Sequence, residues 1–244
     1  MRPLADAQTR RRALDVHARL IDAYGAPPWR LERDPVGVLV STILSQNTND
    51  VNRDRAYGRL RECFPTWEAV RDAGAEAIVD AIHVAGLANH KGPAIQRALA
   101  TISAERGELS LDFLKELPVD EAKAWLVAIN GVGPKTAAIV LLFSLGMPAF
   151  PVDTHVHRVS RRLGLIGPKV TREKAHALLE EVLPAETYYP FHLNLIRHGR
   201  EVCIARAPRC EECTLRELCA FYAESAENPD LPPSTQRTQR NRAL

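Results

Sequence analysis

The sequence lacks the features of a membrane or secreted protein. No apolar run in its 244 residues reaches the roughly 18 that a membrane-spanning helix needs. The N-terminal segment carries Asp6 and Arg10–Arg12 with no apolar h-region after them, which argues against a secretory signal. There are only five cysteines, and four of them lie too close together for a long-range disulfide scaffold. Such thiols suit a reducing compartment, so we expect a cytoplasmic protein.

The net charge is also small, and the formal value of +2 does not by itself indicate a partner. The distribution of the charged residues along the chain is more informative. Five basic residues accompany one acidic residue between Asp153 and Arg172, and Arg197, Arg200, Arg206 and Arg209 follow. A basic stripe is usually a solvated face, but its position near the cysteines is compatible with a polyanionic partner.

Strand-like alternation is scarce, and polar turn signals recur between apolar segments, so we expect an all-α fold. The 45% apolar content can bury a core in one large domain or two small ones. Asp34-Pro35 is typical of a helix cap with a first-turn proline. Thr214–Glu217 has the form of a capping box and predicts the start of a last helix. We expect Cys63 to fill the core and the tail from residue 226 to be mobile.

The remaining cysteines, Cys203, Cys210, Cys213 and Cys219, form a C-x6-C-x2-C-x5-C pattern within 17 residues. Four such thiolates fit either tetrahedral zinc or an iron–sulfur cluster. Zinc sites more often pair two C-x2-C arms across a longer loop, which this pattern matches poorly. The charged residues between the cysteines favour a ligated site over four buried, unliganded thiols.

A second pattern is the stretch Asn130-Gly-Val-Gly-Pro-Lys135 between two apolar helical segments. Gly131 and Gly133 permit a tight hairpin with exposed backbone amides, and Pro134 is preset to begin a helix. Such a turn is suited to one DNA phosphate. Lys135 would lie in the first helical turn, where the dipole disfavours a cation and favours the neutral, nucleophilic amine. A lysine that only binds phosphate explains the local sequence equally well.

Asp153 favours the catalytic interpretation of Lys135 over simple phosphate binding. It precedes Thr154-His-Val-His-Arg158 at a position where it would cap a helix, and its backbone-amide partners would keep it ionised. Capping alone explains an isolated aspartate. A carboxylate paired with a nucleophilic lysine can also accept a proton and stabilise a sugar carbon that becomes cationic.

Together these residues resemble the helix-hairpin-helix DNA glycosylase superfamily, and within it the endonuclease III branch. Three motifs carry the resemblance, in the family's order and spacing. They are Gly131-Val-Gly-Pro-Lys135-Thr-Ala, Val152-Asp153-Thr-His155-Val-His-Arg158, and the four cysteines with the intervening Ile-Ala-Arg-Ala-Pro-Arg.

The resemblance implies a two-domain, all-α protein. A helical bundle would cover residues 34–148, and the cluster domain would combine residues 1–33 with 149–225, leaving the tail 226–244. The four cysteines would hold a 4Fe–4S cluster with a structural role. The partner would be double-stranded DNA with damaged bases or abasic sites, bound between the domains by a monomer associated with the nucleoid.

The resemblance also implies a bifunctional DNA glycosylase and AP lyase for oxidised pyrimidines. Lys135 would attack C1′ of the damaged nucleotide and Asp153 would be the essential aspartate. The base must leave the stack first, and Leu87 occupies the position of a wedge residue, although it also fits a core leucine. Further expected DNA contacts are Gln46, Asn47, Gly131, Gly133, His155, Arg158, Arg206 and Arg209.

One segment departs from the family pattern. Endonuclease III typically has L-S-A-Q-A-T-D where this chain has Leu44-Ser-Gln46-Asn47-Thr-Asn-Asp50. Either Gln46 or Asn47 can therefore supply the duplex contact. Two other functions stay open: a monofunctional glycosylase that removes a mismatched or alkylated base through activated water, and a DNA-binding module without chemistry.

Overall fold

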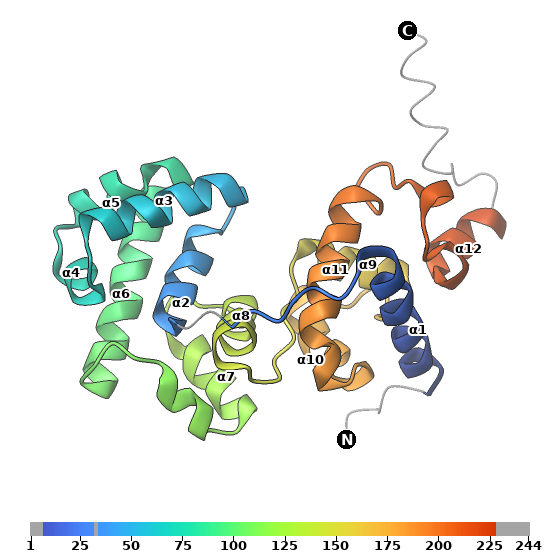
Figure 1. Cartoon of the computed structure of the whole chain (residues 1–244), viewed down its shortest axis with the longest axis horizontal. Helices are drawn as coiled ribbons and strands as arrows, with labels where there is room; N and C mark the ends of the chain where they lie inside the picture. Colours follow the sequence, from blue (N-terminus) through green and yellow to red (C-terminus); the bar gives the residue numbers. More distant parts are fainter. Residues whose placement is uncertain (1–6, 32–33, 228–244) are drawn as a thin grey trace, which may run out of the picture. The chain divides into compact units, whose positions relative to one another are not determined.

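The computed structural model describes residues 7–31 and 34–227, and all regular structure in these ranges is helical (Figure 1). The prediction of an all-α fold is confirmed. No helix within these ranges is both long and apolar enough to cross a bilayer.

The chain divides into two compact units. Unit 1 combines the residues up to Trp29 with those from Phe150 onward, and unit 2 is the continuous segment from Arg30 to Ala149. Unit 1 is therefore assembled from the two ends of the chain, and each unit has its own apolar core.

Unit 2 contains the helices α2 to α8, which Figure 1 colours from blue to yellow-green. They are α2 (Pro35–Leu44), α3 (Asp50–Cys63), α4 (Trp67–Asp72), α5 (Ala75–Ile82), η1 (His83–Ala85), α6 (Ala88–Arg106), η2 (Asp112–Glu116), α7 (Val119–Ala128) and α8 (Pro134–Leu145). The cores of α2, α6 and α8 meet through fully buried residues such as Leu39, Ile95 and Leu141.

The start of α2 follows the expected capping pattern. An Asp34 carboxylate oxygen accepts a hydrogen bond from the Gly37 amide at 2.9 Å, and Pro35 occupies the first helical position. The second Asp34 oxygen accepts the indole N–H of Trp67 at 3.0 Å. One carboxylate therefore both caps α2 and anchors the first residue of α4.

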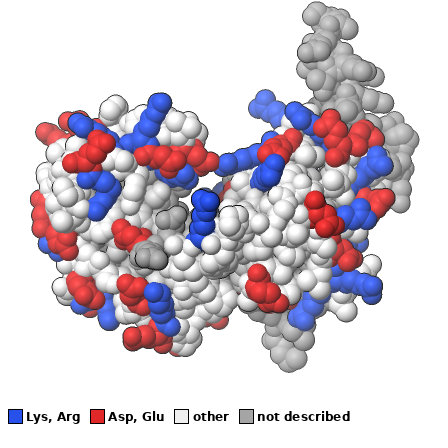
Figure 2. Space-filling model, viewed as in Figure 1, with Lys and Arg blue, Asp and Glu red and all other residues white. Residues whose placement is uncertain are grey.

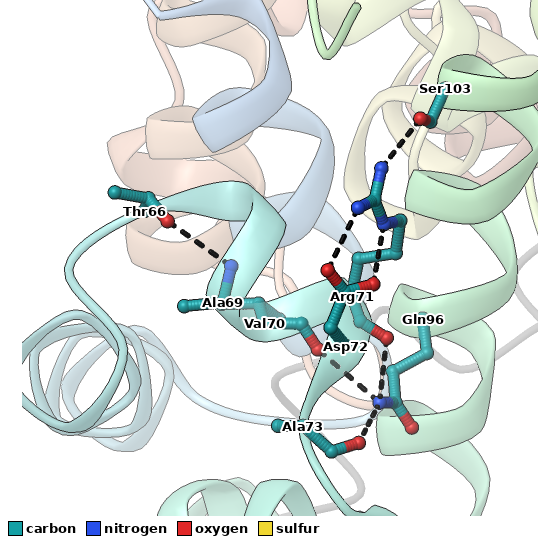
Figure 3. A network of polar contacts seen from close by, with 8 residues as sticks. All are labelled: Thr66, Ala69, Val70, Arg71, Asp72, Ala73, Gln96 and Ser103. Carbon is teal, nitrogen blue, oxygen red and sulfur yellow. Dashed lines mark hydrogen bonds and ion pairs between the residues drawn. The ribbon is translucent and has the colours of Figure 1, made fainter.

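Helix α6 holds the end of α4 through a side chain (Figure 3). The Gln96 amide nitrogen lies 3.2 Å from the Val70 and Arg71 carbonyl oxygens and 2.8 Å from that of Ala73. These carbonyls have no partner within the short helix, so Gln96 satisfies them. The Arg71 guanidinium also donates to Ser103 on α6 at 2.6 Å.

Unit 1 packs the N-terminal helix against late elements of the chain. Its helices are α1 (Ala7–Tyr24), α9 (Thr154–Arg162), α10 (Arg172–Val182), η3 (Ala185–Thr187), α11 (Tyr188–Glu201), η4 (Cys210–Glu212), η5 (Arg216–Leu218) and α12 (Ala220–Glu227). On α11, the Asn194 amide donates to the carbonyls of Leu20 at 3.4 Å and Gly25 at 3.0 Å. Leu20 and Phe191 are fully buried.

Two local expectations were wrong. The Thr214–Glu217 segment does not open the last helix, because this part of the chain folds as the short 3-10 turn η5 and α12 begins only at Ala220. Cys63 is exposed at the end of α3 rather than buried in the core. The expected mobile tail lies, from residue 228 onward, outside the described residues.

Candidate active site and cysteine loop

A tight hairpin joins α7 to α8 in unit 2. Gly131 has φ +92°, a region that favours glycine, and a Cβ there would lie 3.5 Å from Ala94 on α6. The next residue, Val132, is only 4% exposed and anchors the turn in the core. Gly131 and Gly133 stay at the surface.

Helix α8 begins without a side-chain cap. Gly133 is its N-cap residue and supplies no side-chain acceptor, whereas α2, α3 and α9 are each capped by an Asp or Asn side chain. The first-turn amides of α8 therefore have no side-chain acceptor and add to the positive end of the helix dipole. This combination is an anion site of the kind that binds phosphate.

Lys135 lies in the first turn of α8, as the sequence predicted, and its side chain is half-buried. The neighbouring Thr136 and Ala137 are buried, so the backbone that carries the lysine is fixed by the core of unit 2. An unprotonated lysine amine is a nucleophile, and this one is carried by the helical turn that follows the hairpin.

Two loops of unit 2 carry the other predicted contacts. Gln46 and Asn47 follow α2 and are both exposed, and Leu87 lies between η1 and α6. The Gln46 amide nitrogen lies 3.5 Å from the Gly131 carbonyl oxygen, which brings the first loop to the hairpin. Asn47 has φ +53° and Leu87 has φ +51°. This left-handed conformation costs about 1–2 kcal/mol at a leucine, whereas asparagine tolerates it better.

The exposure of Leu87 argues against one of its two interpretations. The residue is 55% exposed, so it is not a core leucine. A large apolar side chain held at the surface in a left-handed conformation is available to another molecule, as the wedge interpretation requires.

Asp153 caps α9 in unit 1. Its Oδ1 accepts a hydrogen bond from the Val156 amide at 2.7 Å, and the side chain is half-buried. The predicted cap is therefore present, and it fixes the orientation of the carboxylate. Asp153 belongs to unit 1 and Lys135 to unit 2.

His155 and Arg158, two further predicted contacts, lie on α9 against α11. The Arg158 guanidinium donates to the carbonyls of Gly199 at 2.7 Å and Cys203 at 3.0 Å, and to His155 Nδ1 at 3.2 Å. A Cβ on Gly199 would lie 3.0 Å from the His155 Cβ, so a larger residue would require the two helices to shift slightly. Burial lowers the pKa of Arg158. In the structure, Arg158 thus joins α9 to the first cysteine.

Arg162, at the end of α9, contacts the same segment. Its guanidinium donates to the Cys203 Sγ at 3.3 Å and to the carbonyls of Ile204 and Ala205, both at 2.9 Å. The Cys219 Sγ lies 3.4 Å from the Arg162 carbonyl oxygen. We call residues 203–219 the cysteine loop, and α9 holds both of its ends.

The four thiols of the cysteine loop are near enough to interact electrostatically. Burial, together with the charges of the other three cysteines, raises the pKa of Cys213 to about 11. Burial and the charges of Cys203 and Cys210 also raise the pKa of Cys219. The Cys213 Sγ also lies 3.5 Å from Nε2 of His198, whose pKa burial lowers to about 4. Repulsion among four thiolates is relieved by bound cations.

The type of donor can be compared with the ligands that metal centres use. No group of three His, Cys, Asp or Glu side chains among residues 7–31 and 34–227 is arranged to hold a metal ion. Four soft sulfur donors are the ligands that a 4Fe–4S cluster uses.

The two arginines expected to contact DNA from the cysteine loop, Arg206 and Arg209, are both exposed. Arg209 lies 3.9 Å from the Glu212 carboxylate, an exposed pair of small energetic value. More generally, lysine and arginine side chains are interspersed with aspartate and glutamate on the face shown in Figure 2. Any preference for a polyanion therefore depends on local groups rather than on net charge.

Sequence reasoning missed Lys91, which is buried beneath the two contact loops. It also missed the bond from Arg162 to the Cys203 thiol. The motif around Arg158 gave no signal for Arg162, although the spacing of four residues places both on one face of a helix.

Two helices joined by a tight glycine hairpin, with an uncapped second helix and a lysine in its first turn, define a helix-hairpin-helix protein. A family model described as "HhH-GPD superfamily base excision DNA repair protein" matches residues 40–185. The match covers more than half of the chain, and the chain belongs to this superfamily.

Similar proteins are found among curated sequences and solved structures. Endonuclease III of Thermotoga maritima is 36% identical over 191 residues, which cover 78% of this chain and 85% of that protein. A candidate DNA glycosylase of Arabidopsis thaliana is 39% identical over 162 residues, or 66% of this chain, but the match spans only 55% of that longer protein.

A solved structure of a trapped covalent intermediate of endonuclease III with DNA, an estranged-adenine complex, has a TM-score of 0.75 and 28% identity. It covers 91% of this chain and 99% of that chain.

Proposed function

We propose that this protein is a bifunctional DNA glycosylase and AP lyase that removes oxidised pyrimidines through Lys135. The observation that carries the proposal is the position of Lys135 in the first turn of α8, directly after the uncapped hairpin. A phosphate bound to the hairpin amides would place a nucleotide sugar near the lysine amine.

In the proposed reaction the Lys135 lone pair forms a bond to C1′ while the glycosidic C1′–N bond breaks. The electron pair of that bond leaves with the base, which takes up a proton. Opening of the sugar ring gives a protonated Schiff base. Loss of a C2′ proton then expels the 3′ phosphate by β-elimination, and water hydrolyses the imine to regenerate Lys135.

The carboxylate of Asp153 has two roles in this proposal. It accepts the proton that the attacking amine loses, and its charge stabilises the cationic sugar carbon as the base departs. The cap to the Val156 amide supports this assignment, because it fixes the orientation of the carboxylate.

The proposed DNA contacts divide between two functions. Gly131 and Gly133 bind phosphate through their amides, while Asn47 and Leu87 enter the duplex beside the extruded nucleotide. The contact of Gln46 with the hairpin carbonyl supports Asn47 as the residue that faces the duplex. His155, Arg158, Arg206 and Arg209 are proposed to contribute to DNA binding from unit 1, Arg158 by holding the cysteine loop.

A 4Fe–4S cluster is the proposed cofactor, held by Cys203, Cys210, Cys213 and Cys219. It would fold the cysteine loop and leave Arg206 and Arg209 at its surface; the reaction consumes no electron. Cys213→Ser should give a colourless protein that has lost most of its affinity for duplex DNA. A colourless variant that binds duplex DNA as tightly as the wild type would contradict this structural role.

Borohydride trapping tests the proposed reaction. Wild type and Lys135→Gln are incubated with duplexes that carry one thymine glycol, one uracil or one abasic site. We expect an adduct on thymine glycol that the substitution abolishes. An adduct on the abasic duplex alone would retain the lyase and exclude this substrate class.

Two results would overturn the bifunctional mechanism. Base release that leaves intact abasic sites and no adduct would identify a monofunctional glycosylase. DNA binding without base release or strand scission on any of the three duplexes would identify a module without chemistry.

A further inference from the structure

Lys91, in the first turn of α6, has an unusual environment for a lysine. Its side chain is only 3% exposed, whereas lysine is almost never fully buried unless it is paired. The ammonium donates three hydrogen bonds: to the Leu44 carbonyl at 2.7 Å, to Thr48 Oγ1 at 2.6 Å and to the Ala85 carbonyl at 2.8 Å. None of these three acceptors is a carboxylate.

The acceptors belong to two separate loops. Leu44 ends α2, and Thr48 lies four residues later, so together they bracket the loop that carries Gln46 and Asn47. Ala85 ends η1, two residues before Leu87. The Thr48 hydroxyl also donates to the Ala85 carbonyl. The two loops therefore meet at one buried charge.

Both loops contain a residue in the left-handed region, which leucine avoids and asparagine tolerates better. Asn47 and Leu87 are the non-glycine residues with positive φ in the described part of the chain. Such conformations persist only where the surrounding structure holds them, and they concentrate at functional sites. Each of the two residues is exposed and lies within three positions of an acceptor of the Lys91 ammonium.

Stability alone does not explain a charge at this position. Burial lowers the pKa of Lys91, which means that desolvation acts against its charged form. An apolar side chain avoids that cost but cannot satisfy three acceptors. An ammonium has three donors and no acceptor, which matches two carbonyls and a hydroxyl.

We propose that Lys91 is a positioning residue that holds Asn47 and Leu87 in the conformation needed to contact a duplex with a missing or extruded base. The free protein then has both loops in place, and binding does not have to order them. The proposal rests on the proposed function for its ligand, duplex DNA, and is independent of the chemistry of Lys135.

The test compares Lys91→Met with Gln96→Met in the full chain with its cofactor. Gln96 lies on the same helix and also donates to three backbone carbonyls, but these belong to the end of α4 rather than to the contact loops. Both variants lose side-chain hydrogen bonds to backbone carbonyl oxygens. Only Lys91→Met loosens the loops that carry Asn47 and Leu87.

Affinity is measured by fluorescence anisotropy with two probes: a duplex with one tetrahydrofuran abasic analogue and the same duplex undamaged. Lys135 cannot cleave the analogue, so the assay reports binding alone. We expect Lys91→Met to reduce the preference for the analogue by about 10-fold, equivalent to about 1.4 kcal/mol. Gln96→Met should retain the wild-type preference within about 2-fold, as expected for a site outside the contact loops.

Hydrogen exchange of the free protein supplies a second readout. The Thr48 amide donates to Ser45 and the His90 amide to Leu87, so both report on the loops. They should lose protection in Lys91→Met and keep it in Gln96→Met. If Lys91→Met does not fold, Thr48→Val removes the bonds of the hydroxyl to the Lys91 ammonium and to the Ala85 carbonyl. It should lower the preference by at least about 5-fold, the typical value of a single neutral hydrogen bond.

A folded Lys91→Met variant with the wild-type preference would overturn the proposal, as would an equal loss in Gln96→Met. A wild type that does not prefer the analogue would also overturn it. Failure of borohydride trapping with the wild type, together with a normal preference for the analogue, would instead contradict the role of Lys135 and leave that of Lys91 intact.

Discussion

Alanine at Gly131 and at Gly133 should separate the two reasons for glycine in the hairpin. Gly131 has φ +92°, and a Cβ there would make only an ordinary contact of 3.5 Å with Ala94. Gly133 has φ −94°, which any residue can adopt, and a Cβ there would meet nothing within 4 Å. Backbone strain therefore arises at the first position and not at the second.

The expected changes in stability follow from this difference. Gly131→Ala should lower the free energy of unfolding by about 1–2 kcal/mol, the cost of a left-handed residue with a Cβ. That loss corresponds to a decrease in Tm of about 2–8 °C for a protein of this size. Gly133→Ala should change stability by less than about 0.5 kcal/mol or raise it slightly, because alanine restricts the unfolded chain.

The affinity for duplex DNA should follow a different pattern. A methyl group at Gly133 would stand at the uncapped start of α8, where a phosphate must approach the amides, so both variants should bind DNA more weakly. Urea unfolding and fluorescence anisotropy measure the two properties on the same samples. Wild-type affinity in Gly133→Ala would refute phosphate binding at the hairpin, and wild-type stability in Gly131→Ala would refute the strain at that residue.

Two further substitutions test the packing of each unit. Asp34→Ala should lower the free energy of unfolding by about 2–3 kcal/mol, measured with urea, because it removes the cap to Gly37 and leaves the Trp67 indole without its acceptor. Asp34→Asn should recover part of this loss. Equal losses in the two variants would contradict the reasoning. Burial lowers the pKa of His17 from its ordinary value of 6.5, so its contribution to stability is complete above that pH and is lost as the pH falls. His17→Phe, which keeps a ring beside Phe191, should lose less stability than the wild type between pH 7 and pH 5; parallel pH profiles would contradict this assignment.

The sequence predicted those features that depend on neighbouring residues. The caps by Asp34 and Asp153 and the start of α8 at Pro134 involve groups within three positions of each other, so local chemistry determines them. The capping-box prediction at Thr214 failed because the segment is constrained from elsewhere. Its flanking Cys213 and Cys219 thiols contact His198 and Arg162, and the chain between them forms a 3-10 turn.

Long-range bonds to backbone oxygens were beyond prediction. Every residue has a carbonyl, so no sequence pattern marks Leu44 and Ala85 as the acceptors of Lys91. The same holds for Gln96 at the end of α4. The exposure of Leu87 was left open for a related reason, since an isolated leucine in a loop carries no periodicity that assigns it to the core or the surface.

The discontinuity of unit 1 has a consequence for synthesis on the ribosome. The buried face of α1 with Leu20 is made early, but its partner Asn194 on α11 follows 174 residues later. At about 5–20 residues per second this interval lasts about 10–35 s. The continuous unit 2 emerges during that time and can fold first. Helix α1 is therefore made before unit 2 but belongs to the unit that is completed after it, and its apolar face stays unpartnered in the nascent chain during that interval.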